Sequence, residues 1–217
     1  MQLSLFPDDF ADISDLERIR GPREFDEAVL KRWGREFIGV DEAGRGPLAG
    51  PVVAAAVILK RNHGIENLRD SKKVSPGERE SLCRMIRKQA RAFSVTFVYP
   101  EEIDDLNILN AALLAMKKAV IRLKSHAPVI VDGNRRIPGI PHAQFPVVKG
   151  DDRSATVAAA SILAKVARDR YMIGMHRKYP QYGFHEHKGY PTKAHLERIR
   201  AHGPCAIHRK TFQGVIA

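Results

Sequence analysis

The sequence predicts an α/β fold in which helices flank one central mixed β-sheet. Short apolar or alternating runs, typical of strands, are interspersed with stretches whose apolar residues recur at helical spacing. One run, residues 129–131, is continuously apolar, as in strands that are buried on both faces. The 217 residues suffice for one domain with a small extension, and such a chain can bury a core without disulfides or a structural metal.

Five runs are expected to form the strands. Residues 37–40 and 52–59 are apolar, and the glycine-rich link between them predicts a hairpin. Residues 93–99 alternate between apolar and polar side chains, which indicates a half-buried strand. The run 129–131 follows, and residues 145–148 form the last short apolar run.

Helices are expected between and after these strands. Ser75 is a good cap for a helix that has Pro76 in its first turn. Apolar residues at spacings of three and four over 109–123 predict an amphipathic helix, and an alanine-rich helix follows from about 154 to 170. Residues 12–33 are expected to form one or two short helices packed on the domain.

The chain is strongly basic, with 36 Lys and Arg against 25 Asp and Glu and a formal net charge of +11. Such an excess favours a polyanionic partner, most often nucleic acid, although a basic protein without that role is the alternative. The first 30 residues hold eight acids and three bases, so the positive charge lies in the rest of the chain. Residues 165–217 hold eleven bases and three acids, which predicts an electrostatic groove there.

The composition excludes several other classes of protein. With 44% hydrophobic and 28% charged residues, the chain is neither disordered nor collagen-like. The longest apolar stretch, residues 51–59, is shorter than the roughly 20 residues of a membrane span. Cys83 and Cys205 have no metal-ligand spacing and imply no disulfide framework, and the beginning of the chain lacks a signal-peptide pattern. We therefore expect a cytoplasmic protein without membrane contact, and nothing requires more than a monomer.

Four carboxylates lie at or just after the ends of predicted strands: Asp41, Glu42, Asp132 and Asp151. Clustered carboxylates repel one another unless cations neutralise them, and oxygen-rich sites select Mg²⁺ or Mn²⁺. Neighbouring strand residues point to opposite faces, so Asp41 and Glu42 are expected to share a metal only if the strand bends or bulges. The alternative is that each acid is a turn or cap residue.

Residues 40–52 resemble a known family signature. They read Val-Asp-Glu-Ala-Gly-Arg-Gly-Pro-Leu-Ala-Gly-Pro-Val, which is similar to the signature of bacterial ribonuclease HII, the type 2 ribonuclease H. The type 3 enzyme carries lysine where this chain has Arg45, so the arginine favours type 2. The resemblance covers about residues 36–212, and its other motifs follow in family order: Asp70–Lys73, Val131–Asn134, Lys149–Asp151, Ala159–Val166, Tyr179–Phe184 and His187–Tyr190.

The resemblance implies a ribonuclease H-like fold with a helical C-terminal part. It also implies two-metal hydrolysis of the RNA strand of RNA–DNA hybrids, and cutting 5′ of single ribonucleotides embedded in duplex DNA. The cut would leave a 3′-hydroxyl and a 5′-phosphate. The catalytic and metal-binding acids would be Asp41, Glu42, Asp132 and Asp151, with Mg²⁺ or Mn²⁺ as the cofactor.

The resemblance further implies contacts with the substrate. Gly44, Arg45 and Gly46 would read the ribose 2′-hydroxyl, since glycine lets backbone groups come close to a sugar. Tyr190 would pack against the adjoining sugar. A tight turn and a core tyrosine are the structural alternatives. The other expected contacts are Ser71, Lys72, Lys149, Lys165 and Lys188.

The start of the chain resembles a peptide that binds the bacterial sliding clamp. Leu5 and Phe6 would enter an apolar pocket and Gln2 would bond at its rim, with Leu3 between them. We expect residues 1–35 to be an N-terminal extension. Residues 36–217 would be the catalytic domain, with a substrate-binding segment from about residue 165.

Two other functions stay open from the sequence. One is another nuclease or a resolvase of the same fold, with similar acids but without selectivity for the 2′-hydroxyl. The other is a basic nucleic-acid-binding module without chemistry, in which the acids would be dispensable.

Overall fold

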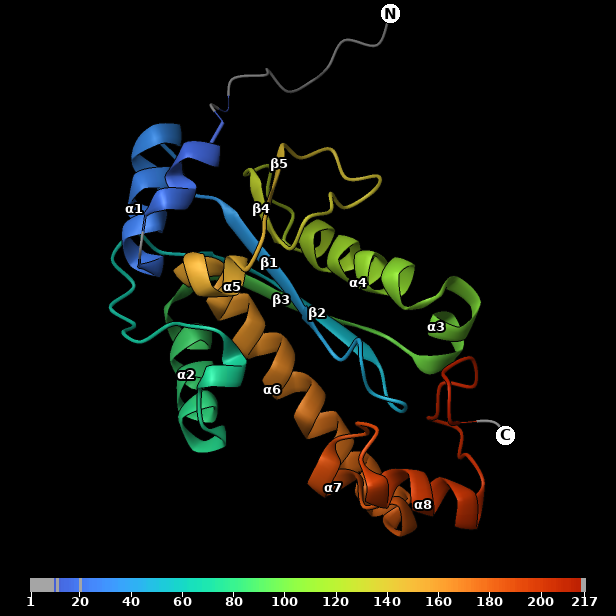
Figure 1. The fold of residues 1–217 in the computed structure, drawn as a ribbon. Coiled ribbons are helices and arrows are strands. Elements are labelled where there is room, and N and C mark those ends of the chain that lie inside the picture. The colour runs from blue at the N-terminus through green and yellow to red at the C-terminus, as the bar shows by residue number, and fades with distance from the viewer. Residues whose placement is uncertain (1–9, 11, 20, 216–217) are drawn as a thin grey trace, which may run out of the picture.

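The computed structural model describes residues 10, 12–19 and 21–215, and it is built around one five-stranded mixed sheet (Figure 1). The strands, in sheet order, are β3 (Ala90–Val98), β2 (Val52–Leu59), β1 (Ile38–Ala43), β4 (Val129–Asp132) and β5 (Gln144–Val147). β1 and β3 run antiparallel to β2, whereas β4 runs parallel to β1 and to β5. The predicted hairpin and the mixed α/β sheet are both confirmed.

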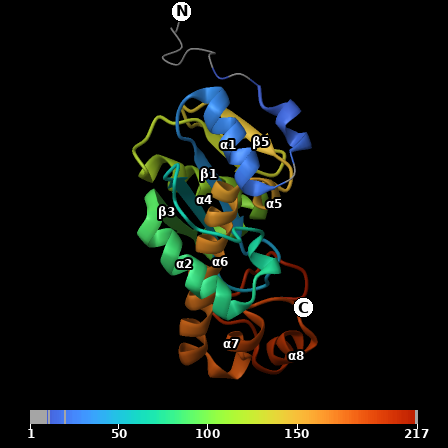
Figure 2. The same cartoon turned by 90° about the vertical axis from the view of Figure 1, so that its left-hand side faces the viewer.

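Helices cover both faces of the sheet (Figures 1 and 2). The regular helices of the described residues are α1 (Pro22–Trp33), α2 (Pro76–Gln89), α3 (Pro100–Leu106), α4 (Ile108–Arg122), α5 (Gly150–Arg153), α6 (Ala155–Lys178), α7 (Phe184–His187) and α8 (Lys193–His202). Three short 3₁₀ turns accompany them: η1 (Ser14–Arg18), η2 (Ser71–Lys73) and η3 (Pro180–Tyr182).

The alternation of side chains along β2 separates two cores. Val53 and Ala55 pack with α6 and α2 on one face, while Val52 and Ala54 pack with α4 on the other. Every residue of β2 is buried, because helices lie on both of its faces. The small alanines in the middle of β2 let the helices on both sides come close to the sheet.

α6 ends at Lys178, eight residues beyond the predicted end of this helix. The added turns carry Met172 into a separate apolar cluster with Leu48, Tyr182 and Phe184, which belong to the Gly-rich loop and the C-terminal part. Tertiary packing against η3, α7 and α8 therefore extends the helix. The expected helical C-terminal part is confirmed, and it lies at the far end of α6 (Figure 2).

The N-terminal segment packs onto the sheet through α1. Phe25, Val29 and Trp33 share a core with Ile130 of β4 and Val157 of α6. The predicted clamp peptide at residues 2–6 lies outside the described residues. Among those that are described, no helix is both long and apolar enough to cross a bilayer.

Asp26 links α1 to the first turn of α6. Its buried Oδ2 accepts hydrogen bonds from the backbone N–H of Thr156 at 2.8 Å and from the Thr156 hydroxyl at 2.7 Å. Burial raises the pKa of Asp26 to about 7, in spite of these bonds. The folded protein thus holds a proton here more tightly than the unfolded chain, in which an Asp has a pKa near 4.

We predict that Asp26→Asn removes a pH dependence of stability. Because the folded pKa is raised, the stabilising contribution of Asp26 is full below about pH 4 and is lost as the pH rises to about 7. Relative to the variant, the wild type should lose on the order of 3 kcal/mol of unfolding free energy between pH 4 and pH 8. Urea unfolding of both proteins at several pH values measures this, and a constant difference would contradict it.

Candidate functional site

A cleft of about 760 Å³ opens at the ends of β1 and β4, beside the Gly-rich loop that joins β1 to β2. Most of the predicted site residues line it: Asp41, Glu42, Gly44, Arg45, Gly46, Ser71, Lys72, Asp132, Lys165 and Tyr190. Asp151, Lys149 and Lys188 lie outside its lining. The fold therefore brings together residues from five separate stretches of the chain.

β1 presents its two acids on opposite faces of the sheet. Asp41 pairs with Ala55, on the side of α6, and Glu42 pairs with Ala54, on the side of α4. The pairing is regular from Gly39 to Ala43, so the strand has no bulge at these two acids. Both acids nevertheless line the same cleft, because they lie near the end of the strand, where the cleft is open to both faces.

Asp132 and Asp151 lie beside Asp41. The parallel pairing places Val131 of β4 next to Val40 of β1, so Asp132 follows in line with Asp41. The Oδ1 atom of Asp132 accepts a 2.7 Å hydrogen bond from the N–H of Gly150, which begins α5 and precedes Asp151. One carboxylate thus fixes the turn that carries another.

Burial is the largest cause of a raised pKa at all four acids. It raises the pKa of Asp41, which is 4% exposed, well above its ordinary value, and the charges of Glu42 and Asp132 add to this. Burial, with the charge of Asp132, raises the pKa of Asp151 to about 6. The pKa values of Glu42 and Asp132 are raised as well, although Arg45 opposes the shift at Glu42.

Few positive charges compensate these acids. Arg45 lies 3.5 Å from Glu42, whereas Asp41, Asp132 and Asp151 form no ion pair with any described residue. Burial lowers the pKa of Lys72, but the charges of Asp70 and the nearby acids outweigh this and leave it raised. The potential ligands are all carboxylate oxygens, and few positively charged side chains lie next to them. Such a site fits a hard divalent ion.

Asp41, Glu42 and Asp132 line the cleft and Asp151 lies outside its lining, so the four carboxylates do not converge on one point. Among the described residues, no group of three His, Cys, Asp or Glu side chains is close enough to hold a metal ion as it stands. A cation would have to draw the acids inward. Both ring nitrogens of His187 are engaged with the backbone: one lies 2.8 Å from the Tyr182 carbonyl oxygen, and the other accepts a hydrogen bond from the N–H of Gly189.

The two glycines beside Arg45 have different environments. Gly44 has φ +99°, and a Cβ atom there would lie 2.2 Å from Nε of Arg168. At Gly46 the nearest atom to such a Cβ would be in the Tyr190 ring, 3.9 Å away, and the backbone is not left-handed. The fold itself therefore requires glycine at 44 but leaves open space at 46.

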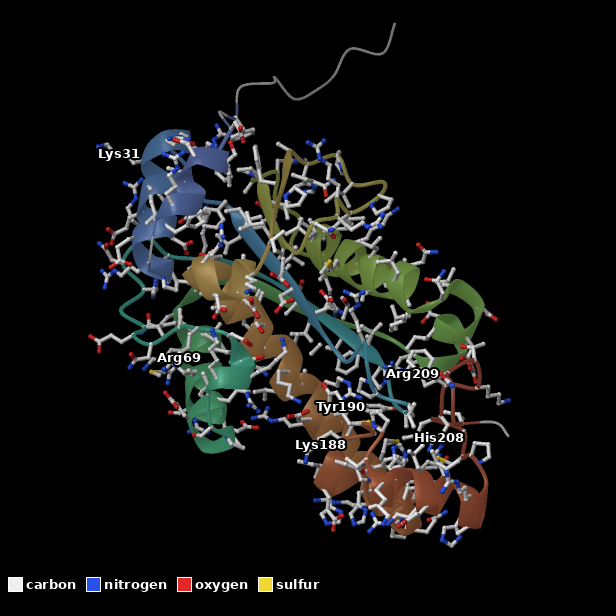
Figure 3. The ribbon with its side chains drawn as sticks, in the orientation of Figure 1. Lys31, Arg69, Lys188, Tyr190, His208 and Arg209 are labelled. Atoms are coloured by element: carbon white, nitrogen blue, oxygen red, sulfur yellow. The ribbon has the colours of Figure 1, made fainter. Side chains whose placement is uncertain are left out.

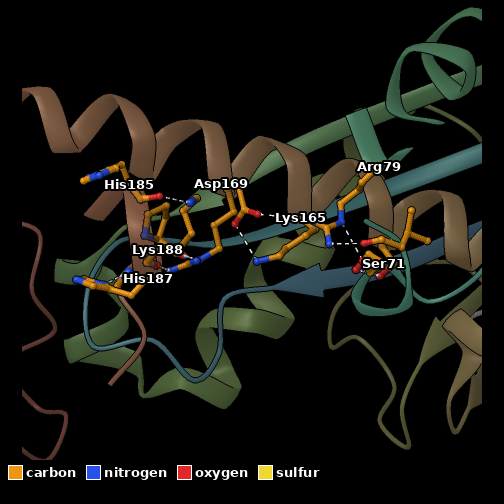
Figure 4. A network of polar contacts seen from close by, with 12 residues as sticks. Ser71, Arg79, Lys165, Asp169, His185, His187 and Lys188 are labelled. Atoms are coloured by element: carbon orange, nitrogen blue, oxygen red, sulfur yellow. Dashed lines mark hydrogen bonds and ion pairs between the residues drawn. The ribbon is translucent and has the colours of Figure 1, made fainter. Parts of the chain in front are cut away.

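The basic candidates are partly engaged with other groups (Figures 3 and 4). Lys165 donates to Asp169 at 2.8 Å and lies 5.6 Å from the centre of the Tyr190 ring. Lys188 donates to the His185 carbonyl, and Lys149 is exposed with a left-handed backbone. Of these three, only Lys165 faces the cleft.

Sequence reasoning missed three residues that shape the site. Ser161 of α6 lines the cleft, donates a hydrogen bond to the hydroxyl of Ser71, and acts to lower the pKa of Asp41. Arg168 and Arg209 are fully buried behind the Gly-rich loop. Ser161 lies inside the Ala159–Val166 motif, but nothing in the sequence marks Arg168 and Arg209 as buried, since arginine is usually exposed.

We predict that Asp132→Asn stabilises the metal-free protein and weakens its response to metal. The amide oxygen can still accept from Gly150, while one repelling charge is removed. A gain of about 1 kcal/mol would raise the melting temperature by about 2–4 °C in a chain of this size. Mn²⁺ should raise the melting temperature of the wild type more than that of the variant.

The control is Asp105→Asn, which removes an exposed acid on α3. Its melting temperature should rise with Mn²⁺ as in the wild type. An equal rise with Mn²⁺ in Asp132→Asn would contradict a metal site at this carboxylate.

Comparison with known proteins confirms the resemblance. The Ribonuclease HII family model matches residues 38–215. The ribonuclease HII of Caldanaerobacter subterraneus is 50% identical over 190 residues, which cover 87% of this chain and 79% of that protein. The ribonuclease HII of Nitrosomonas europaea is 54% identical over 181 residues, covering 82% of this chain and 83% of the other.

Solved structures agree with the fold. The ribonuclease H2 of Pyrococcus horikoshii has a TM-score of 0.69 and 27% identity, over 83% of this chain and 95% of that one. The ribonuclease HII of Archaeoglobus fulgidus, solved in a complex with PCNA, has a TM-score of 0.68 and 29% identity, over 82% of this chain and 96% of that one. The chain belongs to the ribonuclease HII family, and it is a metal-dependent ribonuclease H, an endonuclease acting on the RNA of RNA–DNA hybrids.

Proposed function

We propose that this chain also cuts duplex DNA 5′ of a single embedded ribonucleotide, leaving a 3′-hydroxyl and a 5′-phosphate. The observation that carries the proposal is the cleft, which is lined by the carboxylates of Asp41, Glu42 and Asp132 and also by the exposed Gly46 and Tyr190. The acids Asp41, Glu42, Asp132 and Asp151 would hold two divalent ions, Mg²⁺ or Mn²⁺.

The acids would act as ligands and positioning groups. When bound, two such ions supply an activated water and stabilise the leaving oxygen of a phosphodiester. Asp41 accepts a 2.6 Å hydrogen bond from the N–H of Glu42, which holds its carboxylate in place. Asp132 is held by Gly150 in the same way, so the acids are oriented before the substrate arrives.

The loop at residues 44–46 would distinguish RNA from DNA. Recognition of RNA requires contact with the 2′-hydroxyl, and the open space over Gly46 admits a sugar where a side chain would block it. Tyr190, 38% exposed, borders this space and would pack against the next sugar. Together they favour a junction between a ribonucleotide and a deoxyribonucleotide.

Basic and polar groups around the cleft would hold the phosphates. Arg45, Lys72, Lys165 and Ser71 line it, and Lys149 and Lys188 would contact the strand further out. These contacts are mostly charge-based, so we expect binding to weaken steeply with salt.

We also propose that Gln2–Phe6 binds the bacterial sliding clamp. A solved relative forms a complex with PCNA, which supports an association of this kind. The chain would act as a monomer, with the catalytic domain beginning near residue 36. Both cysteines are free, which suits a reducing compartment such as the cytoplasm.

We predict that Asp41→Asn loses more than about a hundredfold of the cleavage rate, since even the outer partners of metal ligands cost 10–100-fold when removed. The assay is cleavage of a labelled duplex that contains one ribonucleotide, with Mg²⁺ and with chelator. The wild type should cut 5′ of the ribonucleotide only when metal is present.

Asp105→Asn is the matched control and should cut as the wild type does. Binding without cleavage in both the wild type and Asp41→Asn would favour a non-catalytic module. Equal cleavage of an all-DNA duplex would leave the metal site intact and remove the role proposed for the loop.

We predict that alanine at Gly44 lowers the stability of the protein, whereas alanine at Gly46 lowers its activity. Gly44→Ala should lose about 2 kcal/mol or more of stability, because φ is positive there and Arg168 fills the space. Gly46→Ala should stay within about 0.5 kcal/mol of the wild type but lose more than about tenfold in kcat/KM on the embedded ribonucleotide. Urea unfolding and the duplex assay test both, and full activity in Gly46→Ala would show that no sugar comes close there.

A further inference from the structure

Arg209, from the C-terminal part, holds the Gly-rich loop from behind. It is 0% exposed, and all three of its donor nitrogens bond to carbonyl oxygens of that loop. Nη2 bonds to Gly44 at 2.6 Å, Nη1 to Arg45 at 3.0 Å and Nε to Gly50 at 2.9 Å. Both ends of the loop between β1 and β2 are thereby fixed to one planar group.

Arg168 of α6, likewise 0% exposed, fixes the neighbouring backbone. Its Nε donates to the Pro51 carbonyl at 3.1 Å, and its Nη2 donates to Ala49 at 3.1 Å and to Lys188 at 3.0 Å. Its guanidinium also lies 5.6 Å from the centre of the Tyr190 ring. The segment that carries Tyr190 is therefore tied to the same arginine as the loop.

The guanidiniums of Arg168 and Arg209 are buried without carboxylate partners, which is energetically unfavourable. Neither arginine forms an ion pair with a described residue. Burying charges without opposite charges costs free energy, and apolar residues would fill the same volume more cheaply. A role in function would explain why such groups lie here.

The direction of the loop amides indicates that role. In a trans peptide the carbonyl of one residue and the N–H of the next point in opposite directions, and the described chain has no cis peptide. Since the carbonyls of Gly44 and Arg45 point at Arg209, the N–H groups of Arg45 and Gly46 point away from it. Neither N–H has an acceptor among the described residues, and both residues line the cleft.

We propose that Arg209 and Arg168 are positioning residues for sugar recognition. They turn the loop carbonyls inward so that the N–H groups of Arg45 and Gly46 are presented, unpaired, to the 2′-hydroxyl of a ribonucleotide. Two buried positive charges behind the loop also attract the adjacent phosphate. The inference rests on the proposed function, because it assigns the N–H groups of Arg45 and Gly46 as the donors with which the loop would tell RNA from DNA.

Binding selectivity tests the inference. All proteins carry Asp151→Asn to prevent cleavage, and each is titrated with a duplex containing one ribonucleotide and with its all-DNA counterpart. Arg209→Met should lower the ratio of the affinity for the ribonucleotide duplex to that for the all-DNA duplex by about tenfold. This is the effect expected when one hydrogen bond to the sugar is lost. A merely structural role would weaken binding of both duplexes equally and leave the ratio unchanged.

Two further variants separate charge from geometry. Lys210→Met removes the positive charge of the exposed neighbouring residue. This variant should have the same affinity ratio as the parent protein. Arg209→Lys keeps the charge but cannot hold three carbonyls in one plane, so the ratio should fall here as well. A ratio that stays at the parent value in either Arg209 variant would overturn the inference.

A measurement on the parent protein covers the case in which the variants fail to fold. In amide NMR spectra, the Arg45 and Gly46 N–H signals should shift more with the ribonucleotide duplex than with all-DNA. Equal shifts would overturn the inference. A parent that binds both duplexes equally would overturn the proposed selectivity and the inference together, whereas selectivity kept in Arg209→Met would overturn the inference alone.

Discussion

The parallel pairing of β1 with β4 is the constraint on which the site depends. The carboxyl ends of two neighbouring parallel strands lie at the same end of the sheet, so Asp41 and Asp132 lie side by side there. The fold thereby buries like charges together, and burial raises the pKa of each. The Gly150 N–H and the nearby Lys72 offset only part of this repulsion. A divalent cation is the compensation that an oxygen-only site of this kind favours.

α6 connects the two halves of the site. Its first turns lie near the acids, where Ser161 meets Asp41, and its later turns carry Arg168 and Met172 to the Gly-rich loop and the C-terminal part. One rigid helix thus sets the spacing between the groups that would cut and the groups that would recognise the sugar. The extra turns of α6 beyond the predicted end are what make this connection possible.

The N-terminal segment supports the same helix. α1 contributes Phe25 and Val29 to a core with β4 and α6, and Asp26 bonds to Thr156 in the first turn of α6. That turn directly follows α5, which carries Asp151. The change in charge near residue 30 therefore does not coincide with a break in packing. A domain boundary near residue 35 stays a prediction.

The sequence by itself determined the strands and the four longest helices, α1, α2, α4 and α6, and it predicted the acids of the site. Apolar periodicity and turn residues act locally, and the motif around Asp41 and Gly44 is contiguous in the chain. Only the tertiary structure decided how Asp41 and Glu42, on opposite faces of a regular strand, share one cleft. It also decided that Arg209 lies behind Gly44, although 165 positions separate them. The physical reason is that burial and peptide orientation arise from contacts between distant segments, and no local pattern records which carbonyl a buried arginine will hold.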